Sequence, residues 1–292
     1  MRSQPLFGVY GMLTMRALIC SIAVTSFAAA AAAQTKAVVV DQRTIMEAVA
    51  GKTDTILSRT VTSKERVRVD YIGSTAAASP VFRSGMTQLM MTGDSDMTVI
   101  FMDSARKIYA QMKPSSIMSS AGFGAAMKFE STGDSATIDS IGPGPTIAGH
   151  KTLHFRTHSS SRMTMTMFGD TSVRATAVTT DMYVAPDLAS DFAEPDSVRT
   201  KTTSARLRSM TRTIPGAEAM AEQTAKVTKR LAKCGTTLKM VTETTATTAA
   251  GTRTLHMSLE TLNYENKVVS DSLFSVPAGY KKVGLMDLVS PF

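Results

Sequence analysis

The chain has 292 residues, 43% of them hydrophobic, with no tryptophan, 21 methionines and a formal net charge of +8. The basic excess lies in residues 199–233, where nine side chains are basic and two are acidic. Residues 1–33 read as an export leader, as described below, and nucleic acid is not the expected partner of an exported protein. The positive charge favours an anionic membrane surface, lipid head groups or cell-wall polymer. A solvated helix face would carry the same charges, so both interpretations stay open.

Residues 1–33 have the composition of a secretory signal peptide. Arg2 and Arg16 are their only charged residues, and an apolar run followed by six alanines completes the segment. Signal peptidase accepts small residues at such a point, so we expect cleavage between Ala33 and Gln34 and a periplasmic or secreted mature chain. The apolar run is shorter than the roughly 20 residues of a membrane-spanning helix, which disfavours an anchor. The candidate start residues are Met1, Met12 and Met15.

Cysteine usage predicts a mature chain without an internal disulfide. Cys20 leaves with the leader, and Ile19 before it is not the small residue that a lipidation site needs. Cys234 then remains alone, and we expect it to pack as a small apolar residue. Residues 34–292 show no internal repeat and no long linker, which predicts a single β-rich domain with a basic helical insertion at about residues 189–235. The oligomeric state is left open.

Most of this domain alternates apolar and polar residues in the pattern typical of β-strands. Residues 97–112 read as a hairpin that turns at residues 103–106. Gly142-Pro143-Gly144-Pro145 is a strong breaker, so we expect a strand to end at residue 141. The strands expected in chain order are residues 65–72, 97–102, 107–112, 136–141, 151–157, 162–168, 173–184, 236–245, 252–264 and 273–276.

Two segments read as helices. Residues 114–129 are rich in alanine, serine and methionine and predict a short helix. In residues 215–234, Pro215 suits the first turn and Gly235 suits the position just past the end. We expect this second helix to lie on the sheet with its basic residues outward. Its apolar stripe comprises Ala217, Met220, Thr224, Val227, Leu231 and Cys234.

His150, His154 and His158 have the i, i+4 spacing that chelates zinc on a helix. The surrounding alternation instead predicts a strand, with Leu153 and Phe155 toward the core. Neighbouring histidines would then lie about 13 Å apart along the strand. Zinc holds its nitrogen ligands at about 2.0–2.1 Å, so these side chains are expected to form a polar strand face. A helical segment would restore the metal interpretation.

Gly93-Asp94-Ser95 resembles the nucleophile block of a hydrolase family named for its Gly-Asp-Ser motif. The tripeptide recurs at residues 133–135, and each copy lies where we expect a turn, which selects the same residue types. That family also places an acidic residue three positions before a histidine. None of the four histidines here has one, which disfavours the hydrolase interpretation.

Methionines recur along the predicted strands, where they can fill a core or line an adaptable apolar groove. Both interpretations stay open. The candidate ligand-binding residues are Met163, Met165, Met167, Met220, Val227, Leu231, Met240 and Met257. The candidate residues for contact with an anionic partner are Arg206, Arg208, Arg212, Lys226, Lys229, Arg230 and Lys233.

Three segments carry a resemblance to known exported proteins: residues 147–152, 180–188 and 272–283. Together they resemble a bacterial envelope family of unknown function that is similar to the LolA/LolB-like periplasmic lipoprotein carriers. The second segment has Tyr183 where that family usually has tryptophan. The resemblance implies a strongly curved antiparallel sheet, an unclosed barrel or half-barrel, with helices packed on the concave side. It also implies that acyl chains are held between sheet and helices. It supplies no catalytic residue, metal or cofactor.

We therefore expect an exported, non-enzymatic protein that binds a lipid-like ligand or a lipoprotein acyl chain between its sheet and the helix of residues 215–234. The alternative is a structural or interaction module of the cell envelope, with a filled core and a basic contact face. An enzyme is a third, less favoured interpretation, because these residues assemble no nucleophile, acid–base pair or metal set.

Overall fold

The computed structural model describes the parts of the chain that build one sheet. The described residues are 33–47, 53–63, 66–75, 82–92, 97–113, 127–167, 170–188, 222, 226–227, 230–231 and 233–289. The expected signal peptide and most of the expected basic insertion lie outside these residues. No helix in the described part is long and apolar enough to cross a membrane.

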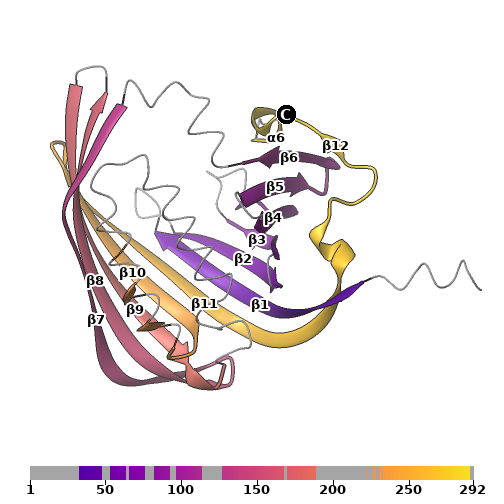
Figure 1. Cartoon of the computed structure of the whole chain (residues 1–292), viewed down its shortest axis with the longest axis horizontal. Coiled ribbons are helices and arrows are strands. Elements are labelled where there is room, and N and C mark those ends of the chain that lie inside the picture. The colour runs from indigo at the N-terminus through magenta and orange to yellow at the C-terminus, as the bar shows by residue number, and fades with distance from the viewer. Residues whose placement is uncertain are drawn as a thin grey trace, which may run out of the picture.

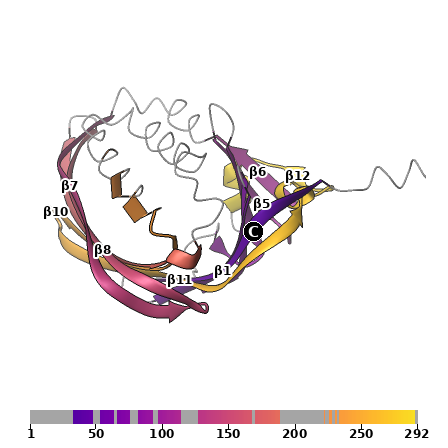
Figure 2. The ribbon, with the colours of Figure 1, turned by 60° about the horizontal axis from the view of Figure 1, so that its bottom comes forward.

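The sheet has twelve strands in the order β12-β6-β5-β4-β3-β2-β1-β11-β10-β9-β8-β7, and only β12 and β6 pair in parallel. It curves strongly, and no pairing among the described residues joins β7 to β12 (Figures 1 and 2). The expected fold class, a curved and unclosed antiparallel sheet, is confirmed. The strands are β1 Gln34–Glu47, β2 Thr53–Thr62, β3 Arg66–Ser74, β4 Met86–Thr92, β5 Met97–Asp103, β6 Ile108–Met112, β7 Met127–Ile147, β8 His150–Met167, β9 Asp170–Ala185, β10 Thr236–Thr248, β11 Gly251–Ser270 and β12 Lys281–Lys282.

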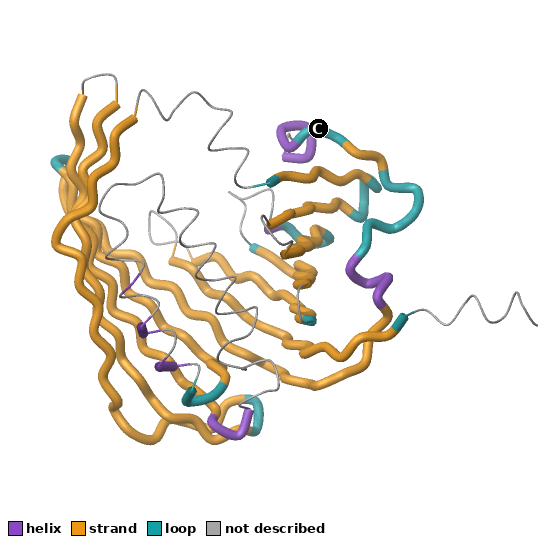
Figure 3. The backbone as a smooth tube through the Cα atoms, viewed as in Figure 1, coloured by secondary structure: helices purple, strands orange, loops and turns teal. Residues whose placement is uncertain are grey.

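Among the described residues, three short helical turns accompany the strands (Figure 3). They are η2 Pro186–Leu188, η3 Asp271–Phe274 and α6 Leu285–Val289. Residues 222, 226–227 and 230–231 of the expected helix are also helical, and they lie on the concave side of the sheet (Figure 2). Gly235 follows at φ 127°, and a Cβ there would lie 2.1 Å from the carbonyl oxygen of Ala185. Only glycine fits where the chain leaves this helical stretch for β10.

The short-strand end of the sheet, β3 to β6, is packed on both faces. On one face, Leu89, Ile100 and Met102 are buried beneath Val276 and Tyr280. The opposite face carries a second buried cluster of Met86, Ala110 and Leu288. The C-terminal segment thus covers the first face, pairs along the edge as β12 and places α6 over the second face.

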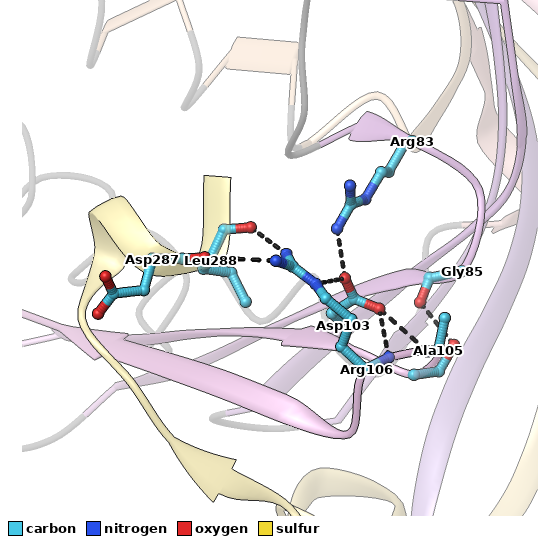
Figure 4. Close-up of polar contacts among 8 residues, drawn as sticks. Arg83, Gly85, Asp103, Ala105, Arg106, Asp287 and Leu288 are labelled. Carbon is cyan, nitrogen blue, oxygen red and sulfur yellow. Dashed lines mark hydrogen bonds and ion pairs between the residues drawn. The ribbon is translucent and has the colours of Figure 1, made fainter. Parts of the chain in front are cut away.

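A carboxylate at the β5–β6 turn holds α6 in place (Figure 4). Asp103, with a side chain only 5% exposed, accepts hydrogen bonds from Arg83 and, at 2.7 Å, from Nε of Arg106. Arg106 also donates to the carbonyl oxygens of Asp287 and Leu288 in α6. Burial alone would raise the pKa of Asp103, but the hydrogen bonds from Arg106 and the charge of Arg83 hold it below its ordinary value.

The Gly142–Pro145 segment does not end a strand, so that expectation is wrong. β7 continues through it to Ile147, with shifts of register at residues 140–142 and 143–146. β7 is an edge strand of the sheet, where proline costs no ladder hydrogen bond on its outer side. Thr152 of β8 donates from Oγ1 to the carbonyl oxygen of Pro145 at 2.6 Å, which secures the segment.

Three further expectations are corrected. Residues 151–157 and 162–168 were expected as separate strands, but β8 is continuous to Met167 because β9 pairs with it without a break. Residues 127–129, expected at the end of a helix, belong to β7, while residues 114–126 lie outside the described part. The expected strand 273–276 is absent: its first two residues belong to the 3-10 turn η3, whose Phe274 is buried against Ala37, Val39 and Val61. Its apolar residues pack against the face of the sheet and do not form a further strand.

Candidate functional site

The concave face of the long strands carries one fully apolar row, called here the apolar row. It consists of Phe155, Met182, Met240 and Leu259, which lie opposite one another on β8, β9, β10 and β11. Directly opposite residues of antiparallel strands share a face. Leu231 and Cys234 pack against Phe155 and Met182, which are 5% and 8% exposed. The helical stretch therefore seals this part of the sheet.

The same face becomes more polar along the strands beyond the apolar row. Thr180 and Thr242 lie in the next row, and their hydroxyls are 3.2 Å apart. Apolar side chains remain among these hydroxyls: Met257 is half-buried, and Leu255, one row further, is 41% exposed. Two arginines, Arg174 and Arg253, follow toward the far end. The concave face thus has an apolar end, a mixed middle and a cationic end.

The predicted ligand-binding residues fall into two groups. Leu231 and Met240 belong to the cluster around Phe155, and Met257 lies diagonally opposite Met240 on the same face. Met163 shares the face but lies eight residues along β8 from Phe155, about 27 Å at the rise of a strand.

The remaining predicted ligand-binding residues are less fully described. Val227 is helical and half-buried. Met165 and Met167 lie on β8, but their side chains are outside the described part. Met220 lies entirely outside it. Sequence reasoning missed Met182, Val184 and Leu259, because the pairing between distant strands that gathers them leaves no local signal. Only the alternation around each one pointed to a buried face.

The predicted basic contact face is described at three positions. Lys226 pairs with Glu222 at 2.8 Å, Arg230 donates to the carbonyl oxygen of Ile138 at 3.5 Å, and Lys233 is exposed. The others, Arg206, Arg208, Arg212 and Lys229, lie outside the described residues, so their role stays a prediction.

The three histidines of β8 lie on the convex face, as the strand interpretation predicted. His154 hydrogen-bonds through Nε2 to Asp181 at 2.7 Å and stacks on Tyr183. His150 hydrogen-bonds to Asp187 at 2.7 Å. Within the described residues, no group of three or more histidine, cysteine or acidic side chains could hold a metal.

Asp181 is the carboxylate that the polar side chains of this convex face share, since both His154 and Arg156 hydrogen-bond to it. Its pKa lies below the ordinary value because Arg156 donates a hydrogen bond to it, with a further hydrogen bond from His154. Arg156 reaches both carboxylate oxygens, at 2.8 and 3.2 Å. Around Asp181, the convex face of β8 and β9 is therefore a set of cross-strand polar pairs. Further along these strands, Ser160, Arg162 and Ala177 line an open hollow.

The sequence also led to predictions for Cys234, for Leu153 and for the two Gly-Asp-Ser tripeptides. Cys234 is half-buried in the apolar cluster, as expected, and its thiol donates to the carbonyl oxygen of Arg230 at 3.4 Å. Leu153 was expected in the core but is 39% exposed and does not belong to the cluster around Phe155. Residues 133–135 form an irregular part of β7 rather than a turn, and residues 93–95 lie outside the described part.

No family model and no curated protein matches the chain. Three solved structures are similar to it. PNGF-II has a TM-score of 0.31 and 10% identity, and covers 87% of this chain and 32% of its own, so this chain spans about a third of it. A putative outer membrane lipoprotein-sorting protein domain from Vibrio parahaemolyticus has a TM-score of 0.28 and 10% identity, with 87% and 94% covered. A LolA superfamily protein from Nitrosomonas europaea has a TM-score of 0.26 and 11% identity, with 82% and 90% covered.

The names of the last two structures agree with the LolA-like resemblance predicted from the sequence. All three TM-scores are below 0.5, so a function has to come from the residues of this chain.

Proposed function

We propose that the protein is an exported, non-enzymatic carrier or receptor that holds a lipid-like, apolar ligand between the concave face of its sheet and the helical stretch before Gly235. One observation carries this proposal. The apolar row is buried where Leu231 covers it, yet apolar side chains continue along the same face as the half-buried Met257 and the exposed Leu255. An apolar ligand would cover these residues.

The chemistry of this face supports the same ligand class. Unbranched methionine side chains adapt to ligands of different shape, and Met240 and Met257 lie beside each other here. Export rests on the composition of residues 1–33, and the absence of catalysis rests on the sequence, in which no catalytic set can be assembled.

A neutral fluorescent probe, N-phenyl-1-naphthylamine, tests the proposal on the mature chain. We expect saturable binding that weakens about tenfold or more in Leu255→Glu, because a carboxylate placed on the concave face must be desolvated beside the ligand. Thr254→Glu is the matched control: the adjacent residue is also exposed but points to the convex face, so binding should be unchanged. Equal effects of the two variants, or no binding by the wild type, would contradict the proposal.

Lipid that co-purifies with the protein is a second test. Native mass spectrometry of protein extracted without detergent should show a population heavier than the mature chain by the mass of a lipid, and organic extraction should remove the added mass. A single species at the mass of the mature chain would count against a carrier.

A second candidate is an interaction module of the cell envelope, favoured by the exposed basic side chains of Arg230 and Lys233. In that case the protein should sediment with cell-wall fractions. Sedimentation should disappear when the basic insertion is reversed in charge, by the combined change of Arg206, Arg208 and Arg212 to glutamate. Retention of binding after this change would exclude the basic insertion as the contact face.

A further inference from the structure

Two arginines occupy the concave face beyond the mixed rows. Arg174 lies opposite Met163, and Arg253 lies opposite Ala246, which in turn lies opposite Thr176. The two arginines are therefore two strands and one row apart, with Cα atoms separated by roughly 12 Å at the spacings of a β-sheet. Both side chains are exposed, and they are long enough to converge on one small group.

Neither arginine has an acidic partner within the described part of the chain. Most other described arginines do, and the ion pairs are Arg43–Glu260, Arg59–Asp41, Arg66–Asp271, Arg68–Asp70, Arg83–Asp103, Arg106–Asp103 and Arg156–Asp181. Pairing is thus the rule for arginine in this sheet. Arg174 and Arg253 depart from it on the face that carries the apolar row.

The two faces of the long strands differ in their charge. On the convex face, acidic and basic side chains occur together: Asp181 and Glu260 beside the apolar row, and Glu243 further along, each lie within 4 Å of a basic side chain. On the concave face, the described side chains of β8 to β11 between the apolar row and Met163 include no carboxylate, and their only charges are those of Arg174 and Arg253. A local field of one sign with no compensating acid attracts an anion.

We propose that the ligand is a single-chain amphiphile with an anionic head group, held with its chain toward the apolar row and its carboxylate or phosphate between Arg174 and Arg253. This inference rests on the proposed function and adds a ligand class and an orientation to it. The guanidinium groups match both oxyanions, because their parallel N–H groups can bind two oxygens at once.

The spacing of the face fits such an orientation. Arg253 lies six residues along β11 from Leu259 of the apolar row, about 20 Å of strand. The intervening rows mix hydroxyls with Met257, Leu255 and Val178, so a chain can contact apolar atoms along this length without leaving a carboxylate of the protein unpaired.

Competition against the fluorescent probe tests the head group with three palmitoyl ligands below their aggregation concentrations. Palmitate and palmitoyl lysophosphatidylglycerol are anionic, and monopalmitoylglycerol is neutral with the same chain. We expect the wild type to bind both anionic ligands about tenfold more tightly than the neutral one, the effect of a charge-assisted hydrogen bond. The double variant Arg174→Gln/Arg253→Gln should lose this preference and bind monopalmitoylglycerol as the wild type does.

Arg162→Gln is the matched control, because Arg162 is next to Met163 on β8 and exposed but points to the convex face. It should keep the preference. A preference that survives in the double variant, or that Arg162→Gln abolishes equally, would overturn the head-group inference while the proposed function stands. Failure of all three ligands to displace the probe, or of the probe to bind at all, would remove both. Inorganic phosphate at the same concentrations should not displace the probe, and displacement by it would indicate a free-anion site instead.

Discussion

The two ends of the sheet differ in how their side chains are buried. At the short-strand end, Leu89 and Met86 lie on opposite faces of β4, and both are at most 2% exposed. At the long-strand end, the described helical residues pack around Phe155, and further along the same face Leu255 is 41% exposed. The short-strand end is thus packed on both faces, whereas the long-strand end is packed around Phe155 and Val184 and leaves apolar side chains exposed further along.

Beyond the apolar row, the long strands are joined mainly by backbone hydrogen bonds and by polar side-chain contacts between strands. The hydroxyl oxygens of Thr245 and Thr254 are 3.1 Å apart, and those of Thr247 and Thr252 are 3.0 Å apart. Each such cross-strand pair contributes about 0.2–1 kcal/mol to the free energy of unfolding. The ion pairs of these strands are partly exposed and contribute about as little. A region of this kind can change its side chains, or receive a ligand, with little effect on folding.

The largest expected effect is at the short-strand end. Leu89→Ala removes a fully buried side chain and leaves a cavity, so the free energy of unfolding should fall by about 2–5 kcal/mol in urea denaturation. The same substitution at the long-strand end, Leu255→Ala, should change it by less than about 1 kcal/mol because that side chain is already exposed. Similar decreases in the free energy of unfolding of the two variants would contradict the difference in packing between the two ends of the sheet.

Gly235→Ala should lower the free energy of unfolding by about 3 kcal/mol or more, a large loss for the long-strand end. The new Cβ would meet the backbone of Ala185, and the residue would also be strained at φ 127°. Gly251→Ala is the control, because Gly251 has φ 122° with no atom within 4 Å of its new Cβ. It should show the strain alone, about 1 kcal/mol. Thermal denaturation of both variants checks this difference.

Asp103→Asn should lower the free energy of unfolding by about 2 kcal/mol, because Arg83 and Arg106 lose a charged acceptor that is itself buried. Arg106 also binds the end of α6, so amide hydrogen exchange near Leu288 should accelerate. Asp139→Asn, an exposed carboxylate on β7, is the control and should have no measurable effect. Unchanged exchange in α6 would show that Asp103 does not hold this helix.

Acidification should produce a smaller, graded loss. The folded pKa values of Asp41, Asp103 and Asp181 lie below the ordinary value of 3.8. Their stabilisation is therefore complete above that value and is lost as the pH falls through the lower folded pKa. Asp181→Asn should flatten part of this decline by less than about 1 kcal/mol, because the pair with Arg156 is partly exposed. Urea denaturation of the wild type and the variant from pH 6 to pH 2 measures how the free energy of unfolding falls with pH. An identical fall in the two proteins would contradict the prediction.

Local sequence patterns predicted most of the strands but not their ends. Alternation and the turn before Ile108 located β5 and β6, and the same signals located β9, β10 and β11. The Gly142–Pro145 segment misled because its effect depends on position in the sheet: an edge strand tolerates proline, and the sequence does not say which strand is at the edge. The segment around Phe274 was wrongly predicted as a strand for a similar reason, since an apolar residue can pack against a sheet or belong to one of its strands.

The candidate site was predicted in part. The helical stripe correctly placed Leu231 and Cys234 against the sheet, because a 3.6-residue period is a local property. The apolar row joins β8 to β11 through the register of each pair, and register is set by contacts that no single segment contains. For the same reason, the predicted methionines were grouped by residue type, although Met163 lies eight residues along β8 from Phe155 while Met240 belongs to the apolar row.

Photolabelling with a diazirine-bearing palmitate, followed by peptide mapping, tests the central claim that the concave face holds the ligand. Successive residues of β11 point to opposite faces, so adducts should appear at Leu255, Met257 and Leu259 and not at their neighbours His256 and Ser258. Excess unlabelled palmitate should abolish the adducts. Labelling of both sets alike, or of the convex residues alone, would contradict the account.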